Sequence, residues 1–272
     1  MILVDAHCHL HDPELADAID AALDRARAMG VEAWITCAVT ADDWATAETF
    51  AATHPGVFAA AGIHPWYGRP EDLSALDHLA ETLARGMVAV GECGLDTRIA
   101  DPPLDAQRPL FARQVAIARE VGLPLNLHCR GAWAELLTVF RRERPPDPPG
   151  ILHNFNGSAE AAAPFLDLGF CLSFGGVMTR RNSRKLADAA RRAWPDHLAL
   201  ETDAPDLPPV EAPTRPNLPE NIVYVARAVA DLLETDADTV AEQAARNAAR
   251  VFRLPLLESG ASGGTAPGDA TP

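Results

Sequence analysis

Short runs of aliphatic and β-branched residues recur at similar spacing along the chain, and segments with helical periodicity separate them. The strand-like runs lie near residues 2–5, 32–39, 57–62, 87–91, 124–128, 150–153, 169–174 and 198–201. The helical segments lie near residues 14–29, 41–53, 72–85, 105–121, 131–143, 158–167, 182–193 and 219–233. Because strands that alternate with helices are typical of parallel βα units, eight such units predict a closed (β/α)8 TIM barrel.

An open, doubly wound sheet is the alternative arrangement of such units. The chain has 272 residues, which suits a single barrel of about 250 residues. No G-x-G-x-x-G motif follows the first strand-like run, which excludes the dinucleotide-binding form of the open sheet. We therefore expect one barrel domain over residues 1–257, with a final helix near 236–252. The Gly-, Ala- and Ser-rich segment 258–272 is expected to be a disordered tail.

The composition restricts both the partners and the compartment. The formal net charge is −15 and Lys185 is the only lysine, so the chain is a poor non-specific partner for polyanions. A nucleic-acid substrate would need bound metal and a local arginine cluster to offset the repulsion. No leader with a cleavage site and no long apolar span is found, so we expect a cytoplasmic protein without a membrane partner, acting as a monomer. The five cysteines form no C-x-x-C pair and are expected to be reduced; they are Cys8, Cys37, Cys93, Cys129 and Cys171.

The first strand-like run ends in the sequence Asp5-Ala6-His7-Cys8-His9. Residues two apart in a strand point to the same side, so Asp5, His7 and His9 share one face. Imidazole is a common ligand for divalent metals. The pattern therefore predicts metal binding, and the alternative is a polar strand end with two solvated histidines.

The ends of other predicted strands carry residues of the same chemistry. In a TIM barrel, catalytic residues project from the carboxyl ends of the strands. A single histidine there is more often a hydrogen-bonded core residue, but the coincidence at several strand ends predicts a metal centre at the barrel mouth. The motifs are Gly62-Ile63-His64-Pro65, Gly91-Glu92-Cys93-Gly94-Leu95-Asp96, Asn126-Leu127-His128-Cys129-Arg130, Leu152-His153-Asn154-Phe155 and Glu201-Thr202-Asp203-Ala204-Pro205.

The number of candidate ligands predicts the number of ions. A catalytic zinc site typically uses three protein ligands, so six candidates suit two divalent ions such as Zn, Mn or Mg. The bridge in many such barrels is a carboxylated lysine, but Lys185 lies in a predicted helix. Glu92 is therefore the best bridging carboxylate, the alternative being a buried ion pair with an arginine. The six candidates are His7, His9, Glu92, His128, His153 and Asp203.

The motifs DAHCHL, GIHP, GECGLD, PLNLHCR, LHNFNG and ETDAP resemble those of the TatD-related metal-dependent deoxyribonucleases of the amidohydrolase superfamily. The resemblance runs from Ile2 to about Leu254. It implies a (β/α)8 barrel, a divalent-metal centre and hydrolysis of phosphodiester bonds in DNA, often as a 3′-to-5′ exonuclease. By this resemblance, His7 and His9 match the histidines of the first metal, His128 and His153 those of the second, Glu92 the bridging acid, and Asp203 the acid that binds metal and handles the proton.

Three departures from the family pattern lie where substrate should sit. Trp66 stands where the family often has a second histidine, and Thr97 stands where an aromatic residue often follows. Pro216 replaces the glycine of an Arg-Gly pair in the loop after ETDAP. The sequence therefore supports the metal centre more firmly than a DNA substrate.

Further residues are assigned to the catalytic step, to substrate binding and to support of the ligands. Asp203 and Glu92 are the predicted catalytic residues, with Asp203 accepting the proton of the attacking water. Four residues are predicted to bind substrate: His64, Arg130 and Arg215 at phosphate oxygens, and Trp66 by stacking on a base. The alternatives are a loop hydrogen bond for His64, an ion pair with a loop acid for Arg130, and simple packing for Trp66.

Asp5 and Asp96 are predicted to orient ligands from behind the centre, and the alternative for Asp96 is a cap on the next segment. The remaining histidines are expected in loops or on helix surfaces, exposed to solvent; they are His11, His54, His78 and His197.

Two other functional classes stay open. One is a metal hydrolase of an aminoacyl ester, an amide or a lactone, because metal-activated water serves all of these bonds and a fold does not define a substrate. The net charge and Trp66 favour it slightly. The other is a non-catalytic protein that keeps a metal for stability, and the complete set of ligand types argues against it.

Overall fold

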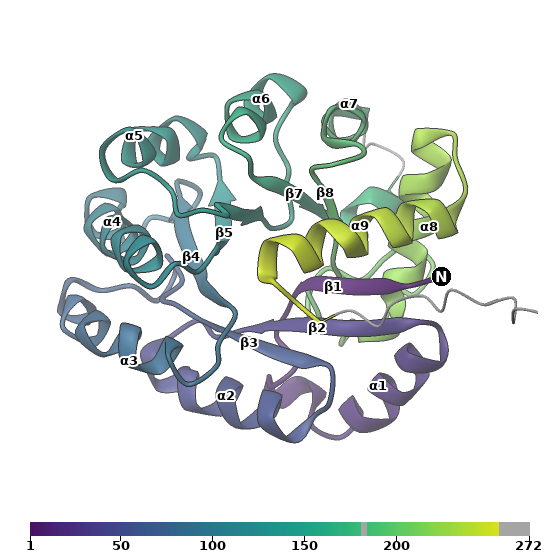
Figure 1. Ribbon diagram of the computed structural model, residues 1–272, viewed down its shortest axis with the longest axis horizontal. Helices are drawn as coiled ribbons and strands as arrows, with labels where there is room; N and C mark the ends of the chain where they lie inside the picture. The colour runs from purple at the N-terminus through teal and green to yellow at the C-terminus, as the bar shows by residue number, and fades with distance from the viewer. Residues whose placement is uncertain (181–183, 256–272) are drawn as a thin grey trace, which may run out of the picture.

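The computed structural model describes residues 1–180 and 184–255. Eight parallel strands pair in chain order around a barrel, as the sequence pattern predicts (Figure 1). The expected tail, residues 258–272, lies outside the described residues. The strands are β1 Leu3–Cys8, β2 Val31–Cys37, β3 Val57–Ala61, β4 Ala89–Asp96, β5 Leu125–Arg130, β6 Gly150–Leu152, β7 Cys171–Phe174 and β8 Leu198–Leu200.

Backbone hydrogen bonds join the segments that follow β1 and β8 at the mouth of the barrel. The His9 N–H donates to the Ala204 carbonyl at 2.7 Å, and the Asp203 N–H donates to the His7 carbonyl at 3.0 Å. These bonds bring the first and last predicted ligand motifs together, although almost 200 residues separate them.

Helices surround the strands, and α1 to α8 follow β1 to β8 in alternation (Figure 1). Lys185 lies in α7, as expected, but its side chain is outside the described part of the chain. No described helix is long and apolar enough to cross a bilayer. The helices are α1 Ile19–Ala28, α2 Trp44–Thr53, α3 Leu79–Leu83, α4 Leu104–Val121, α5 Trp133–Glu143, α6 Ala159–Asp167, α7 Arg184–Ala193, α8 Ile222–Leu233 and α9 Ala237–Phe252.

The segment expected as one helix over 72–85 differs from the prediction. It forms two 3-10 turns, Pro70–Leu73 and Ala75–His78, followed by the short helix α3. Leu76, Leu79 and Leu83 are all buried. A 3-10 turn places residues three apart on the same side, and an α-helix places residues three or four apart on nearly the same side. The prediction of helical structure near 72–85 therefore holds only for the short helix α3, and the prediction of one continuous helix was wrong.

Helix α9 packs against the interior of the barrel at the end opposite the mouth. Its residues Ala245, Ala248 and Phe252 belong to the same buried cluster as the strand residues Val4 and Ile35. The Asn247 side chain donates to the carbonyls of Pro195 and Leu198 at 2.7 and 2.8 Å. Because α9 covers one end, access to the barrel interior is from the carboxyl ends of the strands.

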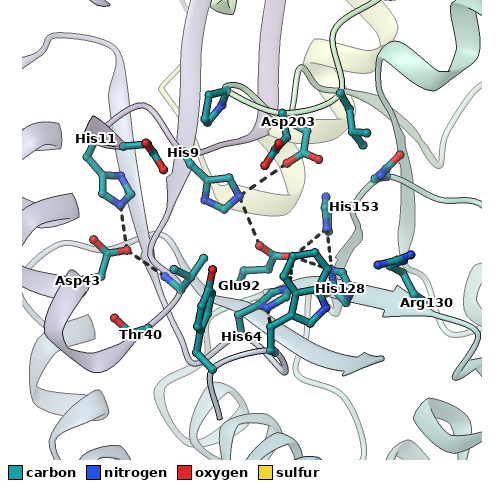
Figure 2. A pocket seen from close by; sticks show the side chains of 18 of the residues that line it. His9, His11, Thr40, Asp43, His64, Glu92, His128, Arg130, His153 and Asp203 are labelled. Carbon is teal, nitrogen blue, oxygen red and sulfur yellow. Dashed lines mark hydrogen bonds and ion pairs between the residues drawn. The ribbon is translucent and has the colours of Figure 1, made fainter. Parts of the chain in front are cut away.

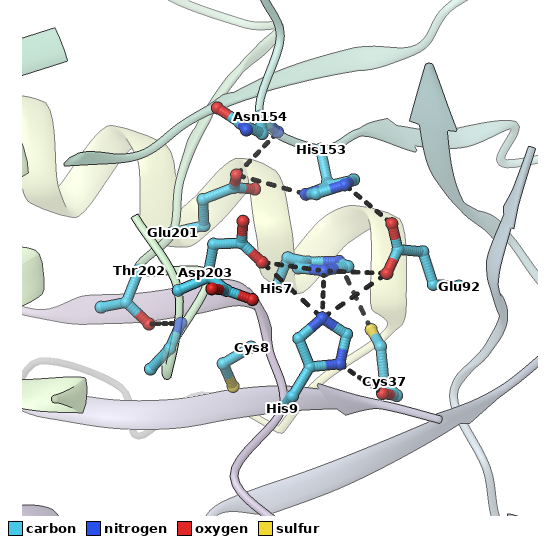
Figure 3. A network of polar contacts seen from close by, with 12 residues as sticks. His7, Cys8, His9, Cys37, Glu92, His153, Asn154, Glu201, Thr202 and Asp203 are labelled. Carbon is cyan, nitrogen blue, oxygen red and sulfur yellow. Dashed lines mark hydrogen bonds and ion pairs between the residues drawn. The ribbon is translucent and has the colours of Figure 1, made fainter. Parts of the chain in front are cut away.

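The five cysteines are free and buried, as expected for reduced thiols. Cys8 donates to the Ile35 carbonyl at 3.3 Å and points away from the ligand face of β1 (Figure 3).

Candidate metal centre

A cleft of about 810 Å³ opens at the carboxyl ends of the strands. Its walls come from the loops that follow β1 to β8, and Glu92 lies near its centre (Figure 2). The structure brings together the six side chains that the sequence analysis selected as candidate ligands. His9, Glu92, His128, His153 and Asp203 line the cleft, and His7 lies fully buried behind them.

One group of donors faces one carboxylate oxygen of Glu92. The Nε2 atoms of His7 and His9 lie 3.3 Å apart, and each lies 3.5 Å from Glu92 Oε2. Asp203 Oδ1 lies 3.6 Å from His7 Nε2 and 3.7 Å from His9 Nε2. The donor atoms of His7, His9 and Glu92 thus form one compact group, and Asp203 lies against its two imidazoles on the side away from Glu92 (Figure 3).

A second group faces the other oxygen of Glu92. His153 Nε2 lies 2.8 Å from Glu92 Oε1, and His128 Nδ1 lies 3.0 Å from the same oxygen. The His153 and His128 nitrogens are 3.4 Å apart. The two oxygens of Glu92 thus point to two different clusters of imidazoles.

These separations fit divalent-cation binding. Ligand distances of 2.0–2.1 Å in tetrahedral geometry place neighbouring donors about 3.4 Å apart. The separations among His7 Nε2, His9 Nε2 and Glu92 Oε2 are 3.3 to 3.5 Å, with imidazole nitrogens and a carboxylate oxygen as the donor atoms. The chemistry and spacing of the donors therefore suit zinc or a similar ion.

Hydrogen bonds to the far side of two imidazoles determine which nitrogen is free. His7 Nδ1 lies 2.7 Å from Asn126 Oδ1, and His9 Nδ1 lies 2.7 Å from the Cys37 carbonyl. Both partners are acceptors, so each Nδ1 carries a hydrogen, and in the neutral ring each Nε2 presents a lone pair to the cluster. The sequence analysis did not select Asn126, although it lies two residues before His128 and so on the same face of β5.

His64 has the opposite arrangement. The Trp66 backbone N–H donates to His64 Nδ1 at 3.1 Å, so in the neutral ring Nε2 carries the hydrogen. That Nε2–H points to Glu92 Oε1 at 3.3 Å. Burial lowers the pKa of His64 to about 4, which keeps the ring neutral at pH 7. His64 is thus a hydrogen-bond donor beside the cluster, and the loop contact foreseen as its alternative role is also present.

Asp5 acts differently from the prediction that it orients a ligand side chain. Its carboxylate accepts from the Thr202 N–H at 2.9 Å and from the Thr202 hydroxyl at 2.5 Å. It also accepts from the His7 backbone N–H at 3.3 Å. The Asp5 carboxylate therefore links the backbone of β1 to the segment after β8. Asn126, and not Asp5, contacts the His7 ring.

Glu201 lies beside His153 and was not assigned a role from sequence. Its Oε1 accepts from the Asn154 N–H at 2.6 Å and lies 3.5 Å from His153 Nδ1 (Figure 3). Glu201 is fully buried. The available signal was its position two residues before Asp203, which again indicates a shared face.

Asp96 contacts two of the predicted substrate residues, Trp66 and Arg130. Its Oδ2 accepts from Trp66 Nε1 at 2.6 Å and lies 3.3 Å from His128 Nε2. Arg130 Nη1 lies 3.5 Å from the same oxygen, and the Arg130 guanidinium lies 5.8 Å from the centre of the Trp66 ring. Asp96 therefore contacts His128 and holds the half-exposed Trp66 at the mouth, and its other oxygen also caps the next segment by accepting from the Arg98 N–H.

Two other positions depart from the sequence-based expectation. Arg215 pairs with Asp206 and is not among the described residues that line the cleft, whereas Asp206 is. His11 is not a solvated surface residue: its side chain is 5 % exposed and its Nε2 lies 3.1 Å from Asp43 Oδ2. The chain turns after β1 and places His11 against β2, where its Nδ1 lies 2.8 Å from the Thr36 hydroxyl oxygen.

The other three histidines were expected at the surface, and only one of them is fully exposed. His78 is exposed. His54 is partly covered by stacking on Phe50, and His197 is partly buried with its Nδ1 3.0 Å from the Phe170 carbonyl.

Burial raises the pKa of both acids of the centre and the neighbouring imidazoles lower it, but the balance differs between Glu92 and Asp203. Burial alone would raise the pKa of Glu92, but the surrounding histidines His64, His153 and His7 hold it well below its usual range. Burial raises the pKa of Asp203 to about 7, although His153 and His7 partly oppose the shift. Glu92 therefore stays ionised, and Asp203 has a pKa near neutrality, which suits a proton acceptor.

An eight-stranded parallel barrel with imidazoles and carboxylates at its strand ends defines the class of metal-dependent hydrolase barrels. Comparison with known proteins supports this class. Residues 4–253 match the family described as TatD related DNase, and the chain belongs to this family.

Relatives and one solved structure show the extent of the similarity. The chain is 34 % identical to YcfH of Escherichia coli over 93 % of its length and 97 % of that protein, which is named as an uncharacterized metal-dependent hydrolase. It is 30 % identical to tatdn3 of Danio rerio, which carries a provisional deoxyribonuclease name, over 92 % and 96 % of the two chains. The crystal structure of the Escherichia coli TatD homologue YjjV superposes with a TM-score of 0.86 at 31 % identity, covering 93 % of this chain and 98 % of that one.

Proposed function

We propose that this protein hydrolyses phosphodiester bonds in DNA as a 3′-to-5′ exodeoxyribonuclease that uses two divalent ions. The observation that carries the proposal is the orientation of Glu92. Its two oxygens face two separate groups of imidazole nitrogens, 3.5 Å from His7 and 2.8 Å from His153. A carboxylate between two such groups suits a bridge between two ions, and paired ions suit in-line displacement at phosphorus.

The side chains around this centre divide the work of hydrolysis. The candidate ligands around Glu92 would hold divalent ions, which when bound would supply an activated water and neutralise the charge that builds on phosphoryl oxygens. Asp203 lies at the edge of the cleft, and its carboxylate accepts the proton of the attacking water and passes it to the leaving oxygen. His64 donates its Nε2–H to a phosphoryl oxygen, because its other nitrogen is held as an acceptor.

The wall beside His128 offers contacts for the rest of a nucleotide. Trp66 is 42 % exposed, and its Nε1–H is held by Asp96, so one ring face is available for a base to stack on. Such stacking contributes roughly 1–3 kcal/mol per base. Arg130 lies beside this ring and supplies a positive charge for a phosphate.

The experiment is a metal-reconstituted assay on end-labelled single-stranded DNA, run in parallel with aminoacyl-ester and lactone substrates. We expect release of single nucleotides from the 3′ end. Glu92→Gln should lower the rate by at least roughly 100-fold, beyond the loss that a missing supporting contact causes. It should also bind fewer metal ions per chain, as measured by elemental analysis.

Glu120→Gln on the exposed end of α4 is the matched control and should retain both the activity and the ions. Hydrolysis of an ester or lactone with untouched DNA would overturn the nuclease proposal and leave the metal centre in place.

A second candidate is hydrolysis of an aminoacyl ester or an amide at the same centre. The cleft wall formed by the loops after β1 and β2 carries the carboxylates of Asp12, Asp42 and Asp43. These charges would repel a phosphate chain and would attract the ammonium group of an aminoacyl ester. The same parallel assay separates the two candidates.

We also propose that the protein acts as a cytoplasmic monomer on DNA ends. Five free cysteines support a reducing compartment. The active centre is built within one chain.

A further inference from the structure

A second cavity, of about 430 Å³, opens beside the metal cleft. It shares Arg130 and Asn156 with that cleft. Arg98, Gly131 and Trp133 complete its lining, so two guanidinium groups face it and no carboxylate is among the described residues that line it. In a protein with a net charge of −15, a cavity lined in this way next to the reacting centre indicates a binding site for an anion.

The chain holds Arg98 in place against the loop that follows β5. The Arg98 N–H donates to Asp96 Oδ1 at 2.7 Å, which anchors the residue just after β4. A side chain at Gly131 would place its Cβ 3.1 Å from Arg98 Nε and 2.5 Å from Thr97 Oγ1. The glycine therefore leaves the space in which the Arg98 side chain lies, next to Arg130.

The positive charge of the cavity is only partly neutralised. Asp96 is the acid near Arg130, and its carboxylate already accepts from Trp66 and from the Arg98 backbone. Within the described residues, the Arg98 guanidinium forms no ion pair. Glu135, in the first turn of α5, is not among the described lining residues.

Helix α5 adds to this potential. It begins at Trp133, directly beside the cavity, and has no side-chain cap at its N-terminus. Uncapped N–H groups and the helix dipole favour an anion at this position.

The opposite wall of the cleft has the opposite charge. Asp43 and Arg130 lie on opposite sides of Glu92 (Figure 2), and Asp12 and Asp42 lie on the Asp43 side of the lining. A polyanion that reaches the metal centre is therefore attracted toward the loops after β4 and β5 and repelled from those after β1 and β2.

We propose that Arg98, Arg130 and the N-terminus of α5 form a subsite for a second phosphate, next to the phosphate that reacts at the metal centre. The nucleic-acid strand then leaves the cleft over this subsite, and its end lies against the acidic wall. This inference rests on the proposed phosphodiesterase function and specifies how the substrate is oriented.

The test compares a substrate that has a second phosphate with one that lacks it. Metal-loaded native enzyme and Arg98→Ala are assayed on single-stranded oligothymidylate and on bis(p-nitrophenyl) phosphate, which is a single diester. Loss of a charge-assisted contact predicts a roughly 10- to 100-fold lower kcat/KM on the oligonucleotide, mainly through KM. The loss on the simple diester should be at least tenfold smaller.

Matched variants separate charge from structure. Arg98→Lys should recover part of the lost kcat/KM on the oligonucleotide, and Arg98→Glu should lose more than Arg98→Ala. Arg141→Ala, on the exposed far end of α5, removes the same charge and should behave as native enzyme. Equal losses of Arg98→Ala on both substrates would overturn the subsite.

Binding of a fluorescent oligothymidylate to the same metal-loaded proteins, followed by anisotropy, keeps the two proposals distinguishable. Binding that depends on Arg98 without cleavage would support the subsite and overturn the nuclease function. Cleavage of both substrates with native binding by Arg98→Ala would overturn the subsite and leave the nuclease function in place. Neither binding nor cleavage by the native enzyme would overturn both.

Discussion

The chemistry of each histidine at this centre depends on the single atom that faces its outer nitrogen. His7 and His9 face oxygens that only accept, so their Nε2 lone pairs are directed to the cluster. His64 faces a backbone N–H, so its Nε2 is a donor. Residues of one type, within a few ångströms of one another, are thereby suited to two different tasks: binding a cation and donating to a substrate oxygen.

Asn126→Ala tests this reasoning at the His7 ring. The variant removes the acceptor for His7 Nδ1 and also the donor to the Ala6 carbonyl. We expect roughly 10- to 100-fold weaker binding of one metal ion and little change at the other. Calorimetric titration of the apo-protein with Zn measures both steps. Asn126→Asp keeps the accepting oxygen and should recover most of the affinity, and native affinity in Asn126→Ala at both steps would contradict this role for Asn126.

At the level of elements, α4 holds the backbone at the ends of β3 and β4, next to two residues that adjoin the candidate ligands. Gln114 accepts from the Ile63 N–H at 2.7 Å and donates to the Ile63 carbonyl at 3.2 Å. Gln107 makes the same pair of contacts with the backbone of Asp96, at 2.8 and 3.0 Å. Where a strand ends, its backbone groups lose their ladder partners and need others when buried. The helix therefore positions His64 and Asp96 through two buried glutamines.

Gln114→Leu is expected to lower the free energy of unfolding by about 2 kcal/mol, because it leaves a buried N–H and a buried C=O of Ile63 without partners. For a chain of this size that corresponds to a fall of roughly 4–8 °C in Tm, measured by differential scanning calorimetry. Gln243→Leu on α9 breaks only one long contact, of 3.3 Å to Asn247, and should change Tm little. Equal effects of the two variants would remove the assigned role of Gln114.

For the whole molecule, the way in which charge is distributed around the barrel mouth bears more on the binding of a polyanion than the net charge does. The surface as a whole repels a polyanion, while the mouth of the barrel offers candidate ligands for divalent cations and, on one side, Arg98 and Arg130. Under the proposed function, we therefore expect the protein to bind a nucleic acid by its end and over a short length. The net charge counted from the sequence describes the overall repulsion of a polyanion, but it does not show at which part of the surface a polyanion could be attracted.

This arrangement predicts a weak salt dependence of DNA binding. Two phosphate contacts on a single strand give a slope of about −1.4 for log K against log salt concentration. Anisotropy titrations of metal-loaded enzyme over a range of KCl concentrations measure the slope, and Arg98→Ala should reduce its magnitude by about half. A slope steeper than about −4 would indicate a much longer contact with DNA and would contradict binding limited to the mouth.

Much of the architecture was predictable from sequence. The order of strands and helices follows from local periodicity, and the residue types at the strand ends follow from reading along the chain. His7, His9, Glu92 and Asp203 could therefore be predicted to meet, because parallel strands of a barrel all end at one mouth. The division of residues 72–85 into turns and a short helix could not be predicted, since both geometries bury the same leucines.

Contacts between distant parts of the chain decided the rest. The free nitrogen of His7 depends on Asn126, the orientation of Trp66 depends on Asp96, and Arg98 occupies a space that exists because residue 131 has no side chain. Each of these is a pairing across different strands or loops, and periodicity within one segment carries no information about such a pairing. By itself, the sequence determined the barrel and its set of candidate ligand side chains, while the tertiary structure decided which atoms face the centre and on which side of the mouth the positive and negative charges lie.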